Sequence, residues 1–94
     1  MHVMYGTFLK PSSVNGCLGL AQQALESQGL QVLKGADGTD YLVVGGSGDV
    51  SLTIVCAPYQ NATWVMISAS SVNQMIAAQA RDVIRGIIES TPVA

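Results

Sequence analysis

The chain has 94 residues, of which 49% are hydrophobic and 11% are charged, and its formal net charge at pH 7 is −2. A chain of this length can enclose one hydrophobic core, so we expect a single domain over residues 1–94. The four lysine and arginine residues are scattered, which argues against nucleic-acid binding, because that function clusters cations against phosphates. No stretch reaches the ~20 apolar residues that cross a bilayer, so we expect no membrane span.

The first predicted elements are a strand and a helix. Residues 2–9 are rich in β-forming side chains and end at Lys10-Pro11, which indicates a strand. Over residues 13–28 apolar side chains recur at helical spacing, and Gly29 stands where a left-handed residue ends a helix. The apolar stripe of this helix contains Val14, Cys17, Leu18, Ala21, Ala24 and Leu25.

A hairpin is predicted next. Residues 30–34 and 41–44 have strand composition, and Asp37-Gly38 is the turn signal between them. The string GGSGD at 45–49 then predicts a second, glycine-rich turn. It does not match a phosphate-binding loop, because it lacks the lysine of such loops and a strand follows it where they have a helix.

Two further strands and a helix complete the chain. Residues 50–57 and 62–69 alternate in side-chain character with the period of two that is typical of strands. Helical spacing returns with the apolar residues from Val72 to Ile88, and Pro92 closes this helix from beyond its end.

The string SSVN occurs twice, at 12–15 and at 70–73, and each time a strand ends and a helix begins. A serine hydroxyl can accept from the free N–H groups of a first helical turn, and Ser71 and Gln74 have the spacing of a capping box. We therefore interpret both strings as helix starts. An internal duplication and an anion site at each helix N-terminus are the alternatives.

This order of elements, β-α-β-β-β-β-α, predicts an α+β fold. Sequential strands usually pair, so the second to fifth strands should form a meander, and the first should pair with the fifth. The expected five-stranded antiparallel sheet has the order 1-5-4-3-2, with two helices on one face. In topology it resembles the TATA-box-binding-protein-like and helix-grip folds, a resemblance that carries no function with it.

The two sheet faces should differ. The face toward the helices should hold Leu52, Ile54, Cys56, Val65 and Ile67. The opposite face should hold Tyr41, Val43, Thr53, Val55, Trp64 and Met66, with Ser51 and Ser68. A sheet face in water normally carries charge, and this one carries none in the third to fifth strands, so we expect it to be covered. The simplest cover is a second copy related by a two-fold axis. A small-molecule or peptide ligand, or an uncovered neutral surface, are the alternatives.

The two cysteines, Cys17 and Cys56, should both point into the core, where they could be free thiols or a disulfide. Their spacing does not fit CxxC redox or zinc motifs. The first ten residues lack the basic and apolar regions of a signal peptide, which favours a cytoplasmic location by default.

The pattern of a helix Cys followed by "A..AL...G", a turn and the alternating strand "VSLTIVC" resembles small uncharacterised bacterial domains that are often exported. The resemblance implies that Cys17 and Cys56 form a disulfide and that the protein is exported. It implies no activity.

No catalytic, metal or cofactor site is predicted. His2 is the only histidine and lies at the N-terminus without a partner for general-base chemistry. Asp37, Asp40 and Asp49 fall in predicted turns and do not have the spacing of a calcium loop. We therefore expect a non-enzymatic binding or interaction module, homodimeric through the open sheet face. The alternative is a ligand-binding domain that uses a cleft between helices and sheet.

Overall fold

The computed structural model describes residues 1–36 and 40–92. Within them, strands and helices follow the predicted order, and the predicted turn at Asp37-Gly38 lies outside the described residues. The elements are β1 (His2–Lys10), α1 (Val14–Ser27), β2 (Gln31–Lys34), β3 (Leu42–Gly46), β4 (Ser51–Tyr59), β5 (Ala62–Ser71) and α2 (Gln74–Ser90).

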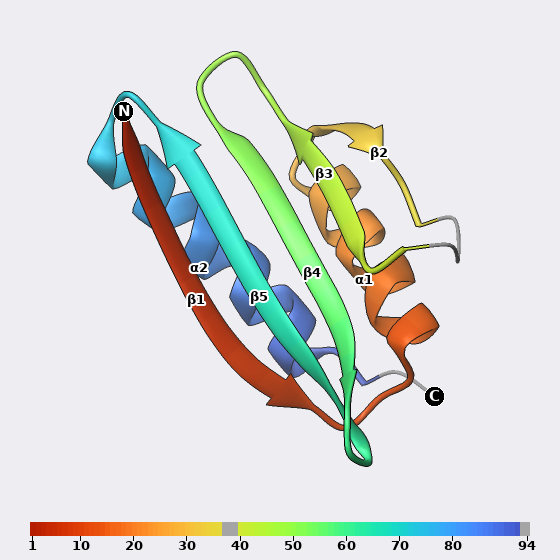
Figure 1. Ribbon diagram of the computed structural model, residues 1–94. Coiled ribbons are helices and arrows are strands. Elements are labelled where there is room, and N and C mark those ends of the chain that lie inside the picture. Colours follow the sequence, from red (N-terminus) through yellow and green to blue (C-terminus); the bar gives the residue numbers. More distant parts are fainter. Residues whose placement is uncertain (37–39, 93–94) are drawn as a thin grey trace.

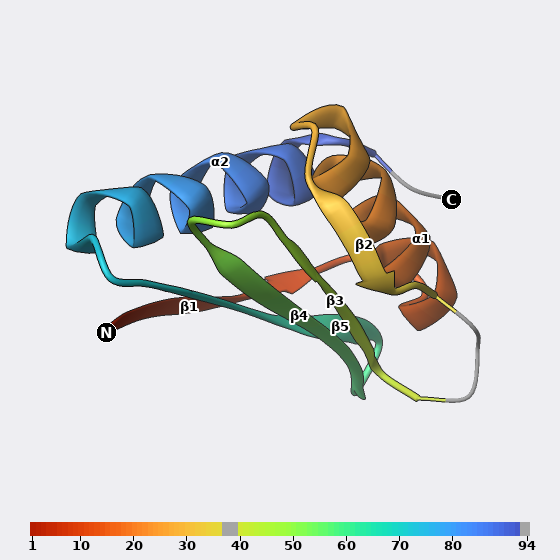
Figure 2. The same cartoon turned by 90° about the horizontal axis from the view of Figure 1, so that it is seen from above.

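The strands form one antiparallel sheet in the order β1-β5-β4-β3-β2 (Figure 1). Both helices lie on the same side of this sheet (Figure 2). Helix α2 packs over β1 and β5, and α1 packs over β4, β3 and β2. The predicted α+β class, strand order and helix placement are therefore confirmed.

The core lies between the helices and the sheet. The predicted helix-facing residues of β4 and β5 are all fully buried, namely Leu52, Ile54, Cys56, Val65 and Ile67. They meet Leu18 and Leu25 of α1 and Ile84 and Ile88 of α2, which are also buried. Burying each such aliphatic side chain contributes about 1.5–3 kcal/mol, so this single layer of contacts holds helices and sheet together.

The two SSVN strings both start helices, but at different positions. Ser13 caps α1, where its Oγ accepts from Gly16 N at 3.0 Å. At the second string the cap is Asn73, whose Oδ1 accepts from Met75 N at 2.9 Å and from Ile76 N at 3.3 Å. The predicted capping box of Ser71 and Gln74 is wrong.

The shift has a structural cause, which is the length of β5. This strand continues to Ser71, whose Oγ accepts from Asn73 N at 3.1 Å, so the helix can begin only after Asn73. Val72 therefore precedes the helix and is 80% exposed, and it is not part of the apolar stripe of α2.

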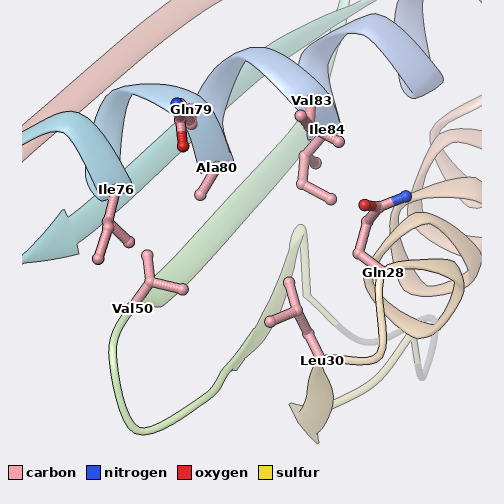
Figure 3. A pocket seen from close by; sticks show the side chains of 8 residues that line it. All are labelled: Gln28, Leu30, Val50, Ile76, Gln79, Ala80, Val83 and Ile84. Carbon is pink, nitrogen blue, oxygen red and sulfur yellow. The ribbon is translucent and has the colours of Figure 1, made fainter.

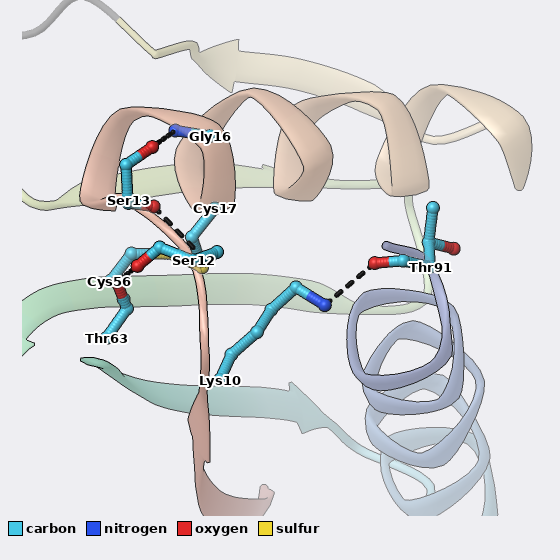
Figure 4. The surroundings of a disulfide bond; sticks show 8 residues. All are labelled: Lys10, Ser12, Ser13, Gly16, Cys17, Cys56, Thr63 and Thr91. Atoms are coloured by element: carbon cyan, nitrogen blue, oxygen red, sulfur yellow. Dashed lines mark hydrogen bonds between the residues drawn. A yellow bond between two sulfur atoms is a disulfide. The ribbon is translucent and has the colours of Figure 1, made fainter. Parts of the chain in front are cut away.

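Helix ends are fixed by both predicted and unpredicted contacts. Gly29 has φ +72°, the left-handed conformation expected at the end of α1. At the end of α2, the buried Lys10 of β1 donates from Nζ to Thr91 O at 2.7 Å (Figure 4). A cation at a helix C-terminus also interacts favourably with the helix dipole. Thr63 Oγ1 donates to Ser12 O at 2.7 Å and fixes the chain between β1 and α1.

A disulfide joins Cys17 of α1 to Cys56 of β4 (Figure 4). The two Cα atoms are 6.1 Å apart, the cysteines are 39 positions apart in sequence, and both side chains are fully buried. The bond decides between the two thiol states that the sequence left open. By the chain-entropy model, closing a loop of this length stabilises the fold by about 4 kcal/mol.

Reduction should therefore lower the free energy of unfolding by about 3–4 kcal/mol, because the unfolded chain regains the freedom of that loop. The measurement is urea unfolding of the same protein with and without reductant. Mass spectrometry after alkylation reports the number of free thiols. Equal urea midpoints for the oxidised and the reduced chain would contradict the role given to Cys17 and Cys56.

Replacing Lys10 with Met should destabilise the fold by about 1–3 kcal/mol, because the Thr91 carbonyl loses a charged donor. The matched control is Lys34→Met, which removes a partly exposed ion pair with Asp40 and should cost less than about 1 kcal/mol. Chemical unfolding of both variants checks the difference. If Lys10→Met costs no more than Lys34→Met, the hydrogen bond to Thr91 does not stabilise the end of α2.

Candidate functional site

The candidate site is the sheet face opposite the helices, which we call the open face. It consists of the side chains that alternate away from the core on four neighbouring strands. They are Val3, Tyr5, Thr7 and Leu9 of β1; Trp64, Met66, Ser68 and Ser70 of β5; Ser51, Thr53, Val55 and Ala57 of β4; and Leu42 and Val44 of β3.

The register divides the open face into two halves. Leu9 pairs with Trp64, which pairs with Ala57, and Met66 pairs with Val55, which pairs with Leu42. These six residues form the apolar half. Toward the other end of the strands, Ser68 pairs with Thr53 and Ser70 pairs with Ser51. These four residues form the hydroxyl half, which Val3, Tyr5 and Val44 flank.

None of the open-face residues carries a charge. On the fifth strand, β2, Lys34 pairs with Val44 and so borders the open face, and it forms an ion pair of 2.7 Å with Asp40. The helix layer by contrast carries Glu26, Arg81, Asp82, Arg85 and Glu89. Antiparallel sheets with one face in water usually place polar and charged residues there, so this distribution is unusual.

The open face exposes large apolar side chains. On β1, the exposed fractions are 59% for Val3, 66% for Tyr5 and 54% for Leu9. Trp64 and Met66 on β5 are partly covered by their neighbours in the sheet. Single exposed apolar residues are normal on proteins, but a contiguous group of them marks an interaction surface.

Of the eight residues predicted for this face, six lie on it: Ser51, Thr53, Val55, Trp64, Met66 and Ser68. Val43 does not, since it pairs with Ile54 and is fully buried under the helices. Tyr41 precedes β3 and is 53% exposed, and its backbone O accepts from Cys56 N at 2.8 Å. The prediction placed β3 one residue out of phase, so Leu42 and Val44 take the positions assigned to Tyr41 and Val43.

The contribution of β1 was missed. Its outward residues Val3, Tyr5, Thr7 and Leu9 are about as apolar as its inward ones, Met4 and Phe8, which pack against the core. No alternation between apolar and polar residues distinguishes the two sides of this strand. The available signal was the pairing of β1 with β5, which puts Thr7 beside Met66 and Leu9 beside Trp64.

A cleft lies on the helix side, between α2 and the end of α1 (Figure 3). This helix cleft has a volume of about 230 Å³. Six apolar side chains and two amides line it, namely Leu30, Val50, Ile76, Ala80, Val83, Ile84, Gln28 and Gln79. Ligand pockets usually have about 300–1,000 Å³, so the helix cleft is small for a binding site.

Residues 1–36 and 40–92 place few side chains together that could bind a metal ion or take part in catalysis. Among residues 1–36 and 40–92, no cluster of three histidine, cysteine or carboxylate side chains could hold a metal ion. His2 is exposed at the start of β1 and faces Ser71 across the ladder. In the described part of the chain, no helix combines the length and apolar character that crossing a membrane requires.

Comparison with known proteins found no family model that matches the chain, no similar curated protein and no similar solved structure.

The assignment of faces can be tested on two neighbouring valines of β3. Val43→Thr should destabilise the fold by about 1–3 kcal/mol, because it buries a hydroxyl in the core. Val44→Thr is the matched control on the open face beside Thr53, and it should change stability by less than about 0.5 kcal/mol. Urea unfolding measures both. Equal losses, or a larger loss at Val44, would show that β3 has the opposite phase.

Proposed function

We propose that the protein is a non-enzymatic interaction module that forms a homodimer through its open face. The observation that carries this proposal is that the outward side chains of four neighbouring strands, which include Leu9, Trp64 and Met66, carry no charge. Packing two such faces together removes their apolar side chains from water, which is the main favourable term in most protein association. It leaves no unpaired charge in the interface.

The size of the open face fits this role. Strands β1, β4 and β5 have 9, 9 and 10 residues, and β3 has 5. With strands about 4.8 Å apart and a rise of about 3.3 Å per residue, they cover roughly 500 Å² per copy. Two copies would then bury about 1,000 Å² in total, the lower bound for a specific interface.

The edge of the sheet at β1, the longer of the two edge strands, is a poorer place for self-association. Edge strands can pair with a strand of another molecule, and β1 is a long edge strand. However, Arg81 of α2 donates from Nη1 to Tyr5 O at 3.3 Å, and Arg85 lies over the Phe8 ring at 5.2 Å. The Arg81 contact engages a backbone oxygen of β1, so an added strand would have to displace it. The face is the more favourable contact.

An oxidising compartment is part of the proposal. The Cys17–Cys56 disulfide supports it, because such bonds persist in exported proteins and are rare in the cytosol. The same two cysteines belong to the pattern that resembles small, often exported bacterial domains, so we propose a bacterial, exported protein of this kind.

A ligand-binding role is the second candidate, and the helix cleft is the observation in its favour. Its apolar walls and the amides of Gln28 and Gln79 would suit a small neutral molecule with one or two hydrogen-bonding groups. This role does not need a dimer, so the oligomeric state separates the two candidates.

Light scattering at high micromolar concentration should give a mass twice that of the 9.8 kDa chain. Met66→Lys should give a monomer, because it would bury an unpaired charge at the centre of the interface. The matched control is Met75→Lys on α2, where the side chain is 70% exposed and away from the open face. This variant should remain dimeric.

A monomeric wild-type protein at that concentration would refute the dimer and leave the helix cleft as the remaining candidate. Equal effects of the two lysine substitutions would show that the association, if present, does not use the open face.

A further inference from the structure

We propose that the two-fold axis of this dimer runs along the strands, between β4 and β5. The inference rests on the proposed dimer and specifies how its two open faces meet. It follows from the uneven distribution of side chains over the face, with the apolar half at one end of the strands and the hydroxyl half at the other.

When two identical sheets of a two-fold dimer pack face to face, the two-fold axis lies in the plane between them. An axis along the strands keeps each end of the sheet opposite the same end of the partner. An axis across the strands places each end opposite the other end. Packed sheets usually keep their strands within about 30° of each other, or cross near 90°. The choice of axis therefore decides what each half of the open face touches.

The hydroxyl half favours the axis along the strands. Within the described residues, the side chains of Ser51, Thr53, Ser68 and Ser70 make no hydrogen bond. A hydroxyl group both donates and accepts, so a group of hydroxyls can bond to an identical group across a two-fold axis. With the axis across the strands these hydroxyls would face the apolar half of the partner, where a buried hydroxyl without a partner is unfavourable.

The apolar half places the axis between β4 and β5. Strand β5 presents the large side chains Trp64 and Met66, and β4 presents the smaller Ala57 and Val55 in the same rows. An axis midway between the two strands sets each large side chain against a small one of the partner. Interdigitation of large and small side chains gives packed sheets their close contact.

The two apolar halves would also meet if the open faces of the two copies overlapped only in part. An axis across the strands, placed over the apolar half, would join Trp64 and Met66 to their symmetry mates and leave the hydroxyl half in water. That arrangement uses about half of the open face. Its total buried area of about 500 Å² lies well below the roughly 1,000 Å² of specific interfaces.

The experiment measures distances between spin labels on identical positions of the two copies. Asn61→Cys lies in the turn between β4 and β5, and Asp49→Cys lies in the turn between β3 and β4, at opposite ends of the sheet (Figure 1). Both side chains are exposed and outside the open face. The native cysteines are bonded to each other and will not take the label. Gln23→Cys, exposed on α1 beyond the sheet, is the control.

With the axis along the strands, both turn labels should lie within about 20 Å of their symmetry mates, since packed sheets are about 10 Å apart. The Gln23→Cys label should give the longest of the three distances, because the helices lie on the outer sides of the dimer. Distances near 30 Å for both turn labels, or one short and one long distance, would overturn the inference while the dimer stands. A labelled protein that is monomeric by light scattering would overturn the proposed function itself.

Discussion

The antiparallel ladder between β1 and β5 is the contact on which the rest of the structure depends. It pairs nine residues of each strand, from His2 with Ser71 to Lys10 with Thr63. Because of this ladder the N-terminal strand lies beside the strand that leads into α2, and β5 becomes an interior strand. Helix α2 can then cover β1 and β5 together, and Lys10 reaches the end of that helix at Thr91.

The same ladder gives the open face its width. Without β1, the uncharged surface would end at Trp64 and Met66. With it, Leu9 and Thr7 extend the two rows that these residues begin. The two helices cover the other face of the sheet (Figure 2), and the Cys17–Cys56 disulfide ties α1 to β4 on that side. The structure thus joins a closely packed helix side to an uncharged sheet side that residues 1–36 and 40–92 leave uncovered.

The sequence predicts this fold well because its local signals agree with one another. Helical spacing, strand alternation in β4 and β5 and the left-handed Gly29 all point to the elements that the structure contains. Strand β3 shows where such reasoning stops. Leu42, Val43 and Val44 are all apolar, so no alternation reveals which of them faces the core. Only the long-range register with β4 decides it, through the pairing of Val43 with Ile54.

Helix starts and the disulfide show the same limit. The identical strings at 12–15 and 70–73 begin helices at Val14 and at Gln74, since β1 ends at Lys10, before the first string, whereas β5 continues to Ser71 within the second. The thiol state of Cys17 and Cys56 depends on the distance between α1 and β4, which no local pattern contains. Interactions between distant segments therefore supply what the local sequence leaves undecided.

The fluorescence of Trp64 tests the central claim most directly, because it is the one tryptophan of the chain and lies within the apolar half of the open face. Its quenching by acrylamide can be followed while the protein is diluted from high to low micromolar concentration. If two open faces cover each other, quenching should be weak at high concentration and rise, with a red shift of the emission, as the dimer dissociates. Strong quenching that is the same at every concentration would show that water reaches this surface throughout.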